Sequence, residues 1–213
     1  MSSYQTQATG LQKIILLVLV LIIIVFGGWI FLSNHKGKTI ETGIQVAEAP
    51  RQGPVSVKTT FRHDEYTIIP LATFTMKGKI LSKKRYFFGD GADIMPYDLA
   101  MGWKRMSDET ILDRIKIWQI SRWYRWKPKT GYYPIPRREI ERCSANMHLI
   151  PANKSIRKKI KKADEWDLIK LQGYLVKVIS DDNRRWKSSL TRNDTGGGAC
   201  EVIWVEEFEI LKS

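Results

Sequence analysis

One histidine lies in a stretch dense with polar side chains, residues 144–148, and is well suited to acid–base chemistry. The pKa of an unperturbed imidazole lies near neutrality, so His148 is a candidate general base. A serine hydroxyl would then be the nucleophile, and a carboxylate would orient the ring. The candidate nucleophiles are Ser144, Ser188 and Ser189, and the candidate orienting groups are Asp194 and Glu201. The chain has no G-x-S-x-G elbow, which favours a purely structural histidine beside the start of a strand.

Residues 186–201 form the densest polar stretch, with several hydroxyls, a carboxylate and three consecutive glycines. Successive backbone N–H groups in such a segment can bind an anion. The stretch does not match G-x-x-x-x-G-K-[ST] and no helix is expected after it, so it is not a nucleotide loop. A glycine-rich hairpin turn is the favoured interpretation.

Metal ligands do not cluster in the sequence. Asp90, Asp93 and Asp98 lack the spacing and the closing glutamate of a calcium loop. His35 and His63 are isolated from other ligand types. We therefore expect neither a metal nor a cofactor.

Two cysteines, Cys143 and Cys200, are candidates for a disulfide. Both fall in the part expected to form a β core, and an oxidising compartment would allow one bridge closing a long loop. In a reducing compartment they would be two buried thiols. No C-x-x-C pair occurs, which argues against a zinc or thioredoxin-like site.

The chain is strongly basic, with a formal net charge of +13. Its densest basic segment, residues 154–162, is expected to form a short helix that could contact an anionic surface such as lipid head groups. The contact residues would be Lys154, Arg157, Lys158, Lys159, Lys161 and Lys162. Residues 121–126 interleave arginines with aromatic residues, but Arg–Trp packing explains them, so a nucleic-acid partner is not expected.

Residues 14–32 contain no charged side chain, which predicts a transmembrane helix and a bilayer as partner. Bulky residues at 29–32 occupy the place where a signal peptide needs small ones, so an uncleaved anchor is predicted. The expected organisation is an N-terminal tail at 1–12, a transmembrane helix at 13–33, a linker at 34–56 and a basic soluble domain at 57–213.

The soluble domain is expected to be α+β. Residues 107–126 are predicted as an amphipathic helix, with Ser107 as a candidate N-cap. Strands are predicted around 66–88 and, at the C-terminal end, in three runs joined by short turns. In the first of these runs the apolar phase switches at Gly173, which indicates a bulge or bend. A small antiparallel barrel or sandwich with one packed helix follows from this pattern.

Five strings of the chain stand out: DLAMGW at 98–103, MSD at 106–108, SRWY at 121–124, SANMHLIPA at 144–152 and SSLTRNDTGGGACE at 188–201. In this order they resemble a group of bacterial single-pass membrane proteins with no established activity. The resemblance covers residues 65–211 and implies a bacterial envelope protein, without a mechanism.

The expected location is therefore the bacterial inner membrane. Lys36 and Lys38 after the apolar run favour a cytoplasmic domain, but a short N-terminal tail before a long domain favours a periplasmic one. We expect the periplasm, with the cytoplasm as the alternative. The expected function is a binding or scaffolding module near the membrane, with an envelope protein or anionic lipid as partner. The alternative is a membrane-tethered hydrolase that uses His148 with a serine or an acid from residues 188–201.

Overall fold

The computed structural model describes residues 10–34, 40–56, 60–191 and 200–211 of the chain. Contacts divide the chain into two compact units, Met1–Ile40 and Glu41–Ser213. The second unit contains every buried core residue of the described chain, from Val46 to Phe208.

The first unit contains helix α1 (Gly10–Asn34), whose side chains are described for residues 12–26. No helix in the described part of the chain is both long and apolar enough to cross a membrane. The predicted transmembrane helix at 13–33 is therefore wrong. So is the single-pass inner-membrane location.

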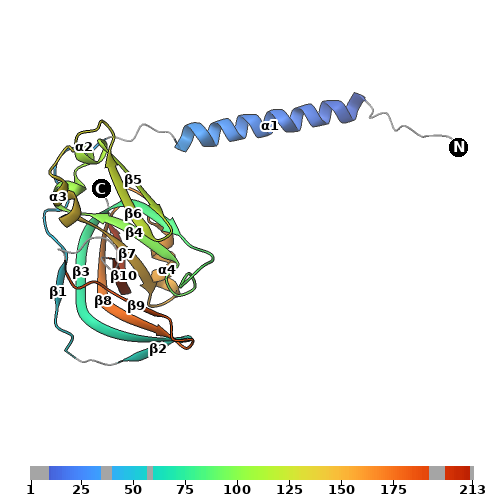
Figure 1. The fold of residues 1–213 in the computed structure, drawn as a ribbon. Coiled ribbons are helices and arrows are strands. Elements are labelled where there is room, and N and C mark those ends of the chain that lie inside the picture. The colour runs from blue at the N-terminus through green and yellow to red at the C-terminus, as the bar shows by residue number, and fades with distance from the viewer. Residues whose placement is uncertain (1–9, 35–39, 57–59, 192–199, 212–213) are drawn as a thin grey trace. The chain divides into compact units, whose positions relative to one another are not determined.

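The second unit is mostly β-sheet (Figure 1). Eight strands form one sheet in the order β1-β3-β4-β7-β10-β8-β9, with β2 also paired to β3. A separate hairpin consists of β5 (Ile115–Ile120) and β6 (Trp123–Pro128). The strands of the main sheet are β1 (Arg51–Gly53), β2 (Phe61–His63), β3 (Tyr66–Arg85), β4 (Tyr97–Gly102), β7 (Ser144–Pro151), β8 (Leu168–Ser180), β9 (Arg185–Lys187) and β10 (Glu201–Leu211).

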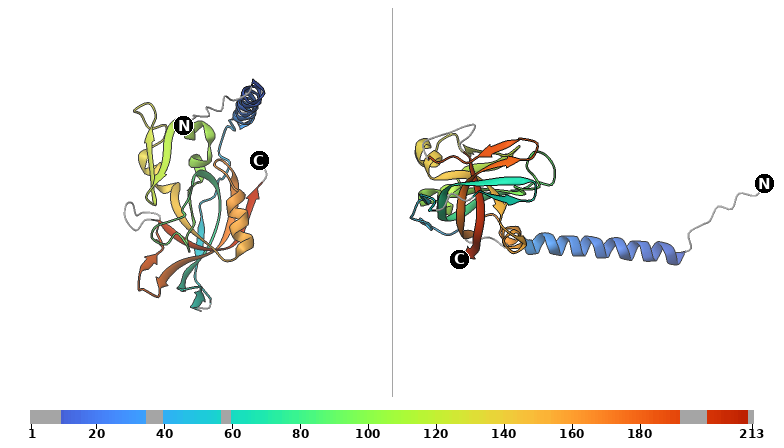
Figure 2. Two further views of the ribbon diagram at one scale, coloured as in Figure 1. Left: turned by 90° about the vertical axis from the view of Figure 1, so that its right-hand side faces the viewer. Right: turned by 90° about the horizontal axis from the view of Figure 1, so that it is seen from below.

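The helices of this unit are short. They are the 3-10 helix η1 (Lys104–Ser107) and the α-helices α2 (Glu109–Leu112), α3 (Arg137–Arg142) and α4 (Lys154–Lys162). Figure 2 shows α4 alongside β10. The fold class is thus a large, mostly β architecture, and the predicted small barrel or sandwich with one packed helix is wrong.

Strand β3 organises the sheet. It pairs with β8 from Tyr66 to Lys79 and with β4 from Lys79 to Arg85, so it joins both ends of the path β4-β7-β10-β8. Apart from the parallel pair β7–β10, these pairings are antiparallel. The result places the centres of β4, β7 and β10 side by side.

The predicted helix over residues 107–126 is wrong, because most of it forms the β5–β6 hairpin. The isoleucines and aromatic residues of this segment favour a strand. Apolar residues three to four positions apart did not distinguish a helix from a strand here. Ser121 and Arg122 form the two-residue turn, both with positive φ (49° and 65°). A type I′ hairpin turn requires positive φ at both of its central residues, which are usually Asn and Gly.

The C-terminal strands lie close to where the sequence predicts them. The irregularity at Gly173 is also present, but the extra residue lies in β10, where the register with β8 shifts between Val205 and Glu207. A Cβ atom at Gly173 would lie 1.9 Å from the carbonyl oxygen of Trp204, so the partner strand approaches too closely for a side chain.

Part of the predicted linker at 34–56 belongs to the folded unit. Val46 is buried in the core and its N–H donates to the Ser107 hydroxyl at 2.9 Å. Residues 51–53 form β1 against β3. The compact unit therefore begins at about Glu41.

Candidate functional site

Asp98 and His148 face each other across two neighbouring strands. In the antiparallel register of β4 and β7 they are direct partners, so their side chains lie on the same face of the sheet. Oδ1 of Asp98 lies 2.9 Å from Nδ1 of His148, and the Asp98 side chain is completely buried. The ring N–H meets this oxygen obliquely, so the contact is a close ion pair rather than a well-aligned hydrogen bond.

Cys200 reaches His148 from the third strand. Strand β10 runs parallel to β7 with Glu201 level with Met147, so Cys200 enters the sheet at the level of Asn146. The Cys200 thiol is partly exposed, and its interaction with the imidazole of His148 raises the pKa of that ring. Three adjacent strands thus present an Asp98–His148–Cys200 chain.

The environment of His148 shifts its titration. Burial lowers the pKa of the imidazole, whereas the interactions with Asp98 and then Cys200 raise it. Together the two interactions outweigh burial, so the pKa is raised to about 9. At neutral pH the ring is therefore protonated. An imidazole ring beside a thiol is the pairing that nucleophilic cysteines use.

A second cation shares the buried carboxylate. Nη1 of Arg122 lies 2.9 Å from Oδ1 of Asp98 and 3.0 Å from the carbonyl oxygen of Met95. The backbone N–H of Arg122 donates to the Tyr86 hydroxyl at 3.0 Å, and its guanidinium lies over the Tyr86 ring at 4.2 Å. These contacts hold the positive-φ residue of the hairpin turn in place. A strained backbone of this kind is often found at functional sites.

Asn146 links the hairpin to the thiol. Its Nδ2 donates to the Arg122 carbonyl at 2.9 Å and lies 3.9 Å from Sγ of Cys200, and its Oδ1 accepts from Gln119 at 2.6 Å. The amide is therefore fixed in orientation, with one N–H directed at the sulfur.

The predicted serine nucleophiles are engaged elsewhere. Ser188 donates to the Ser189 carbonyl at 2.9 Å and accepts from the Val202 N–H at 3.1 Å. Ser189 donates to the Thr191 carbonyl at 3.1 Å. Such bonds between side chain and backbone hold the segment that precedes β10.

Ser144 likewise donates to the backbone, to the Ile140 carbonyl at 2.7 Å. Glu201 follows Cys200 in the strand and so projects to the opposite face of the sheet, which does not suit it to orient His148. Asp194 lies outside the described residues.

The two cysteines are free thiols in this structure. Cys200 is level with Asn146, and Cys143 lies three residues before Asn146, which corresponds to about 10 Å along a strand. A disulfide needs Cα atoms about 4.4–6.8 Å apart. The geometry therefore argues against the predicted Cys143–Cys200 bridge.

The predicted basic helix is present as α4. Asn153 caps its N-terminus, accepting from the N–H groups of Ser155 and Ile156 at 2.9 and 3.0 Å. Ile156 and Ile160 are buried, and the opposite face is exposed. The exposed cations are Lys154, Arg157, Lys158, Lys159, Lys161 and Lys162.

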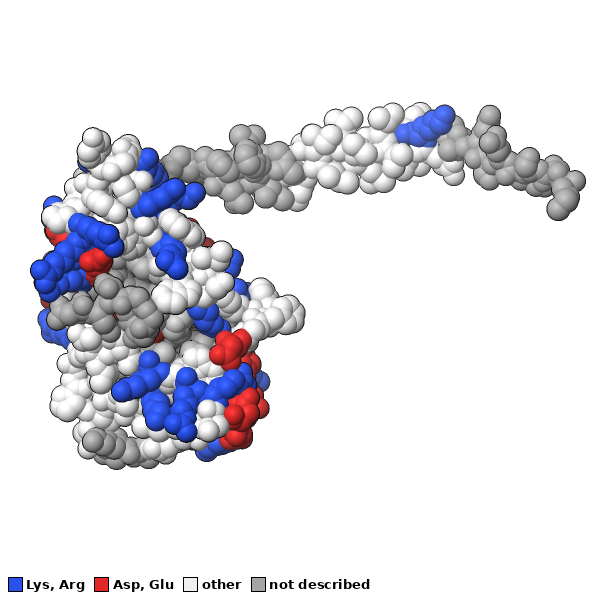
Figure 3. Space-filling view, viewed as in Figure 1, with Lys and Arg blue, Asp and Glu red and all other residues white. Residues whose placement is uncertain are grey.

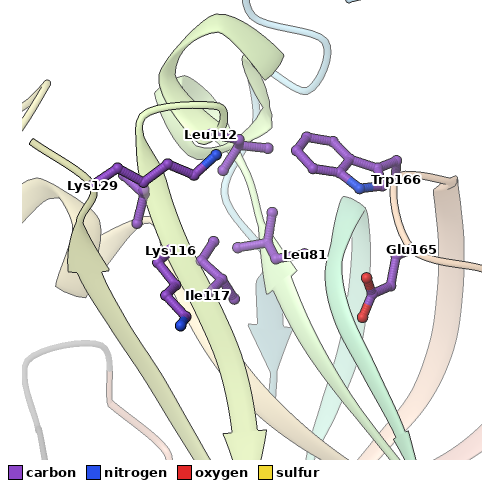
Figure 4. Close-up of a pocket in the computed structure, with 8 residues that line it drawn as sticks. Leu81, Leu112, Lys116, Ile117, Lys129, Glu165 and Trp166 are labelled. Carbon is purple, nitrogen blue, oxygen red and sulfur yellow. The ribbon is translucent and has the colours of Figure 1, made fainter. Parts of the chain in front are cut away.

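A pocket of about 220 Å³ lies away from these groups, between the hairpin and the segment after α4 (Figure 4). Leu81, Leu112 and Trp166 supply apolar walls, and Lys116, Lys129 and Glu165 supply charges at its edges. Lys129 is paired with Asp113 at 3.4 Å. The pocket includes no member of the Asp98–His148–Cys200 chain.

Comparison with known proteins gave no matching family model, no matching curated protein and no matching solved structure. Within residues 10–34, 40–56, 60–191 and 200–211, no group of three or more His, Cys, Asp or Glu side chains is placed to hold a metal ion. The site must therefore be interpreted from its own geometry.

Sequence reasoning identified His148 but neither of its two partners as such. From the sequence alone, Asp98 belongs to a calcium-loop pattern whose spacing does not fit, and Cys200 is either half of a disulfide or a buried thiol. A polar residue inside a strand whose six residues are all buried was the available signal for Asp98. The signal becomes visible only when residues 97–102 are known to form a buried strand.

Proposed function

We propose that this protein is a cysteine-dependent acyl-transfer enzyme, a hydrolase or transferase, with Cys200 as nucleophile. His148 is the acid–base residue and Asp98 orients and charges its ring. The observation that carries the proposal is the placement of Asp98, His148 and Cys200 on three neighbouring strands, with Asp98 2.9 Å from His148. A nucleophile, a base and an orienting carboxylate in contact define this class of site.

The chemistry follows from the charges of the pair. The Cys200 thiolate attacks the carbonyl carbon of an ester, thioester or amide, so that a C–S bond forms and the bond to the leaving group breaks. His148 gives its proton to the leaving group. Water then attacks the thioester, His148 takes a proton from that water, and the acid departs as the thiolate re-forms. Another nucleophile in place of water gives a transferase.

Arg122 and Asn146 support this centre. Arg122 compensates the charge of Asp98, which would otherwise be a buried carboxylate with a single partner. Asn146 holds the hairpin turn against the thiol and directs an N–H toward the sulfur. Donors aimed at developing negative charge stabilise acyl-transfer intermediates.

Of the two functions expected from the sequence, the geometry favours the hydrolase, with a thiol in place of the predicted serines. If Cys200 is unreactive, the binding or scaffolding module becomes the better interpretation. The thiol's reactivity therefore separates the two.

Alkylation by iodoacetamide, followed by peptide mass spectrometry, tests the thiol directly. We expect Cys200 to react at least about tenfold faster at pH 7 than Cys200 in a His148→Gln variant, because glutamine cannot act as the acid–base partner of the thiol. Cys143, a buried thiol in the same chain, is the internal control. The folded protein should also form an acetyl thioester at Cys200 with p-nitrophenyl acetate, and Cys200→Ala should not.

Equal alkylation rates in the parent and His148→Gln proteins, together with no acetylation of Cys200, would contradict the proposal. The melting temperature of each variant shows whether the fold is retained. Asp98→Asn, which keeps the shape of the carboxylate, should lower the rate in the same direction as His148→Gln.

A further inference from the structure

The loop between β3 and β4 exposes two consecutive phenylalanines. Phe87 is 65% exposed and Phe88 is 91% exposed. The guanidinium of Arg85 lies 4.1 Å from the centre of the Phe87 ring, which leaves the other face of that ring free for solvent or a partner. Exposed aromatic residues side by side are unusual on a soluble surface and mark a binding function.

The turn of the β5–β6 hairpin adds further apolar area. Ile120 is 57% exposed and Trp123 is 41% exposed. The bond from the Arg122 N–H to the Tyr86 hydroxyl places this turn beside the residue that precedes Phe87. We refer to Phe87, Phe88, Ile120 and Trp123 as the aromatic rim.

Basic side chains adjoin the aromatic rim. Lys84 and Arg85 precede it in the chain and are exposed. Lys83 donates through Nζ to the carbonyl oxygens of Lys161, at 2.9 Å, and Ala163. The end of β3 is thereby tied to the C-terminal end of α4, where β3 approaches this helix (Figure 1).

The exposed face of α4 extends this basic region. Among the residues that the structure describes, none forms an ion pair with the six cations of α4. Figure 3 shows that Lys and Arg outnumber Asp and Glu on the face it presents. An apolar rim and unpaired cations are thus held together by the Lys83 contacts.

We propose that the aromatic rim and the basic face of α4 form an interfacial site for an anionic phospholipid bilayer. Aromatic side chains are favoured at the boundary between head groups and acyl chains, and cations are attracted to anionic head groups. The site does not involve α1, and it does not depend on the chemistry of Cys200.

Two observations favour lipid over other partners. Ile120 lacks a π-face on which a nucleic-acid base could stack, and Phe87 and Phe88 are neighbours at a loop rather than spaced along a groove. A second copy of the chain is disfavoured because the net charge of +13 makes the copies repel each other.

The test uses residues 41–213, which hold every described core residue, so that α1 contributes nothing to binding. We expect this unit to sediment with vesicles of equal parts phosphatidylcholine and phosphatidylglycerol, and not with phosphatidylcholine alone. Phe87→Ser with Phe88→Ser should weaken binding at least about tenfold, because the apolar insertion is lost. Added salt should weaken it as well.

Matched controls isolate each component. Tyr132→Ser changes an aromatic residue that is 81% exposed on the loop between β6 and α3, at the other end of β6 from the rim, and should leave binding unchanged. Lys158→Gln with Lys162→Gln should weaken binding. Arg51→Gln with Arg138→Gln, which removes equal charge from β1 and α3, should weaken it less.

The proposal is overturned if the parent unit does not bind the anionic vesicles. It is also overturned if the phenylalanine double variant binds them as well as the Tyr132→Ser control does. Preferential binding to a single-stranded oligonucleotide over these vesicles would assign the surface to a nucleic acid instead. Should the double variant melt below the parent, Phe88→Ser alone, at the more exposed position, decides the question.

Discussion

Asp98 is the residue on which the candidate site depends. Its carboxylate is completely buried and one oxygen faces both Arg122 and His148. A buried charge is costly unless it is paired, and removing one partner leaves the other uncompensated. The arrangement therefore couples the protonation of His148 to the stability of the fold, which makes the pair measurable without knowledge of a substrate.

The first prediction concerns that coupling. The pKa of His148 is raised to about 9 in the folded protein, against an unperturbed value of about 6.5 in an unfolded chain. Protonated His148 thus stabilises the folded state fully below about pH 6.5, and this contribution is lost as the pH rises through about 9. The free energy of unfolding should fall by up to about 3 kcal/mol over that interval.

Urea unfolding of the parent and of His148→Gln at pH 6 and pH 9.5 measures the effect. Glutamine keeps a donor near Asp98 but cannot titrate, so the difference between the two profiles isolates the histidine. If the free energy of unfolding changes equally with pH in the two proteins, protonation of His148 does not stabilise the fold by the predicted amount.

At the level of elements, the β5–β6 turn has a strained backbone that places the side chain of Arg122 against Asp98. Ser121 and Arg122 both adopt positive φ, which costs roughly 1 kcal/mol for each residue that is not glycine. Arg122 is retained there by Asp98, Met95 and Tyr86. Ser121 is exposed and makes no comparable set of contacts within the described part of the chain.

The second prediction follows from this asymmetry. Ser121→Gly should raise the free energy of unfolding by about 0.5–1 kcal/mol, because the strain is relieved and nothing is lost. Arg122→Gly relieves the same strain but leaves Asp98 short of a cation, and it should lower stability by more than 1 kcal/mol. Thermal melts of the two variants compare the same substitution at adjacent positions. A stabilising Arg122→Gly would refute the role given to the Asp98 pair.

The third prediction concerns the bend at Gly173. A Cβ atom there would lie 1.9 Å from backbone oxygen of β10, which cannot move without breaking strand pairing. Gly173→Ala should therefore cost about 3 kcal/mol or more. Gly78→Ala is the matched control. Its Cβ would come closest to the ends of the flexible Met76 and Met101 side chains, at 2.5 and 2.8 Å, and would lie 3.3 Å from the nearest backbone oxygen, that of Gly102. Similar losses of stability for the two variants would count against the close approach.

The sequence predicted the elements whose signals are local. The capped basic helix at 154–162 and the strand with its irregularity at Gly173 are both present. The hairpin at 115–128 was missed, because its turn has no glycine or asparagine and depends on Arg122 contacts made far away in the chain. The partners of His148 were missed for the same reason, since only strand pairing brings residues 98 and 200 to it.

On the scale of the whole folded unit, an N-terminal segment outside the sheet completes the core. Glu109, which is buried, pairs with the buried Lys79 and accepts from the backbone N–H of Glu41 at 3.2 Å. The Lys104 N–H donates to the Val46 carbonyl at 2.6 Å. Residues 41–46 thus cover a buried ion pair and the η1 turn, although their composition is that of a linker.

The fourth prediction compares two N-terminal boundaries. A fragment of residues 41–213 should unfold cooperatively with the melting temperature of the full chain, because it contains the whole described core. A fragment of residues 57–213, the domain expected from composition, loses Val46, β1 and the bonds to Ser107 and Glu109. Burial of Val46 alone contributes about 1.5–3 kcal/mol, and exposure of the Lys79–Glu109 pair adds to the loss. The shorter fragment should therefore melt lower by at least about 5 °C. Equal melting temperatures for the two fragments would mean that residues 41–56 lie on the folded unit without stabilising it.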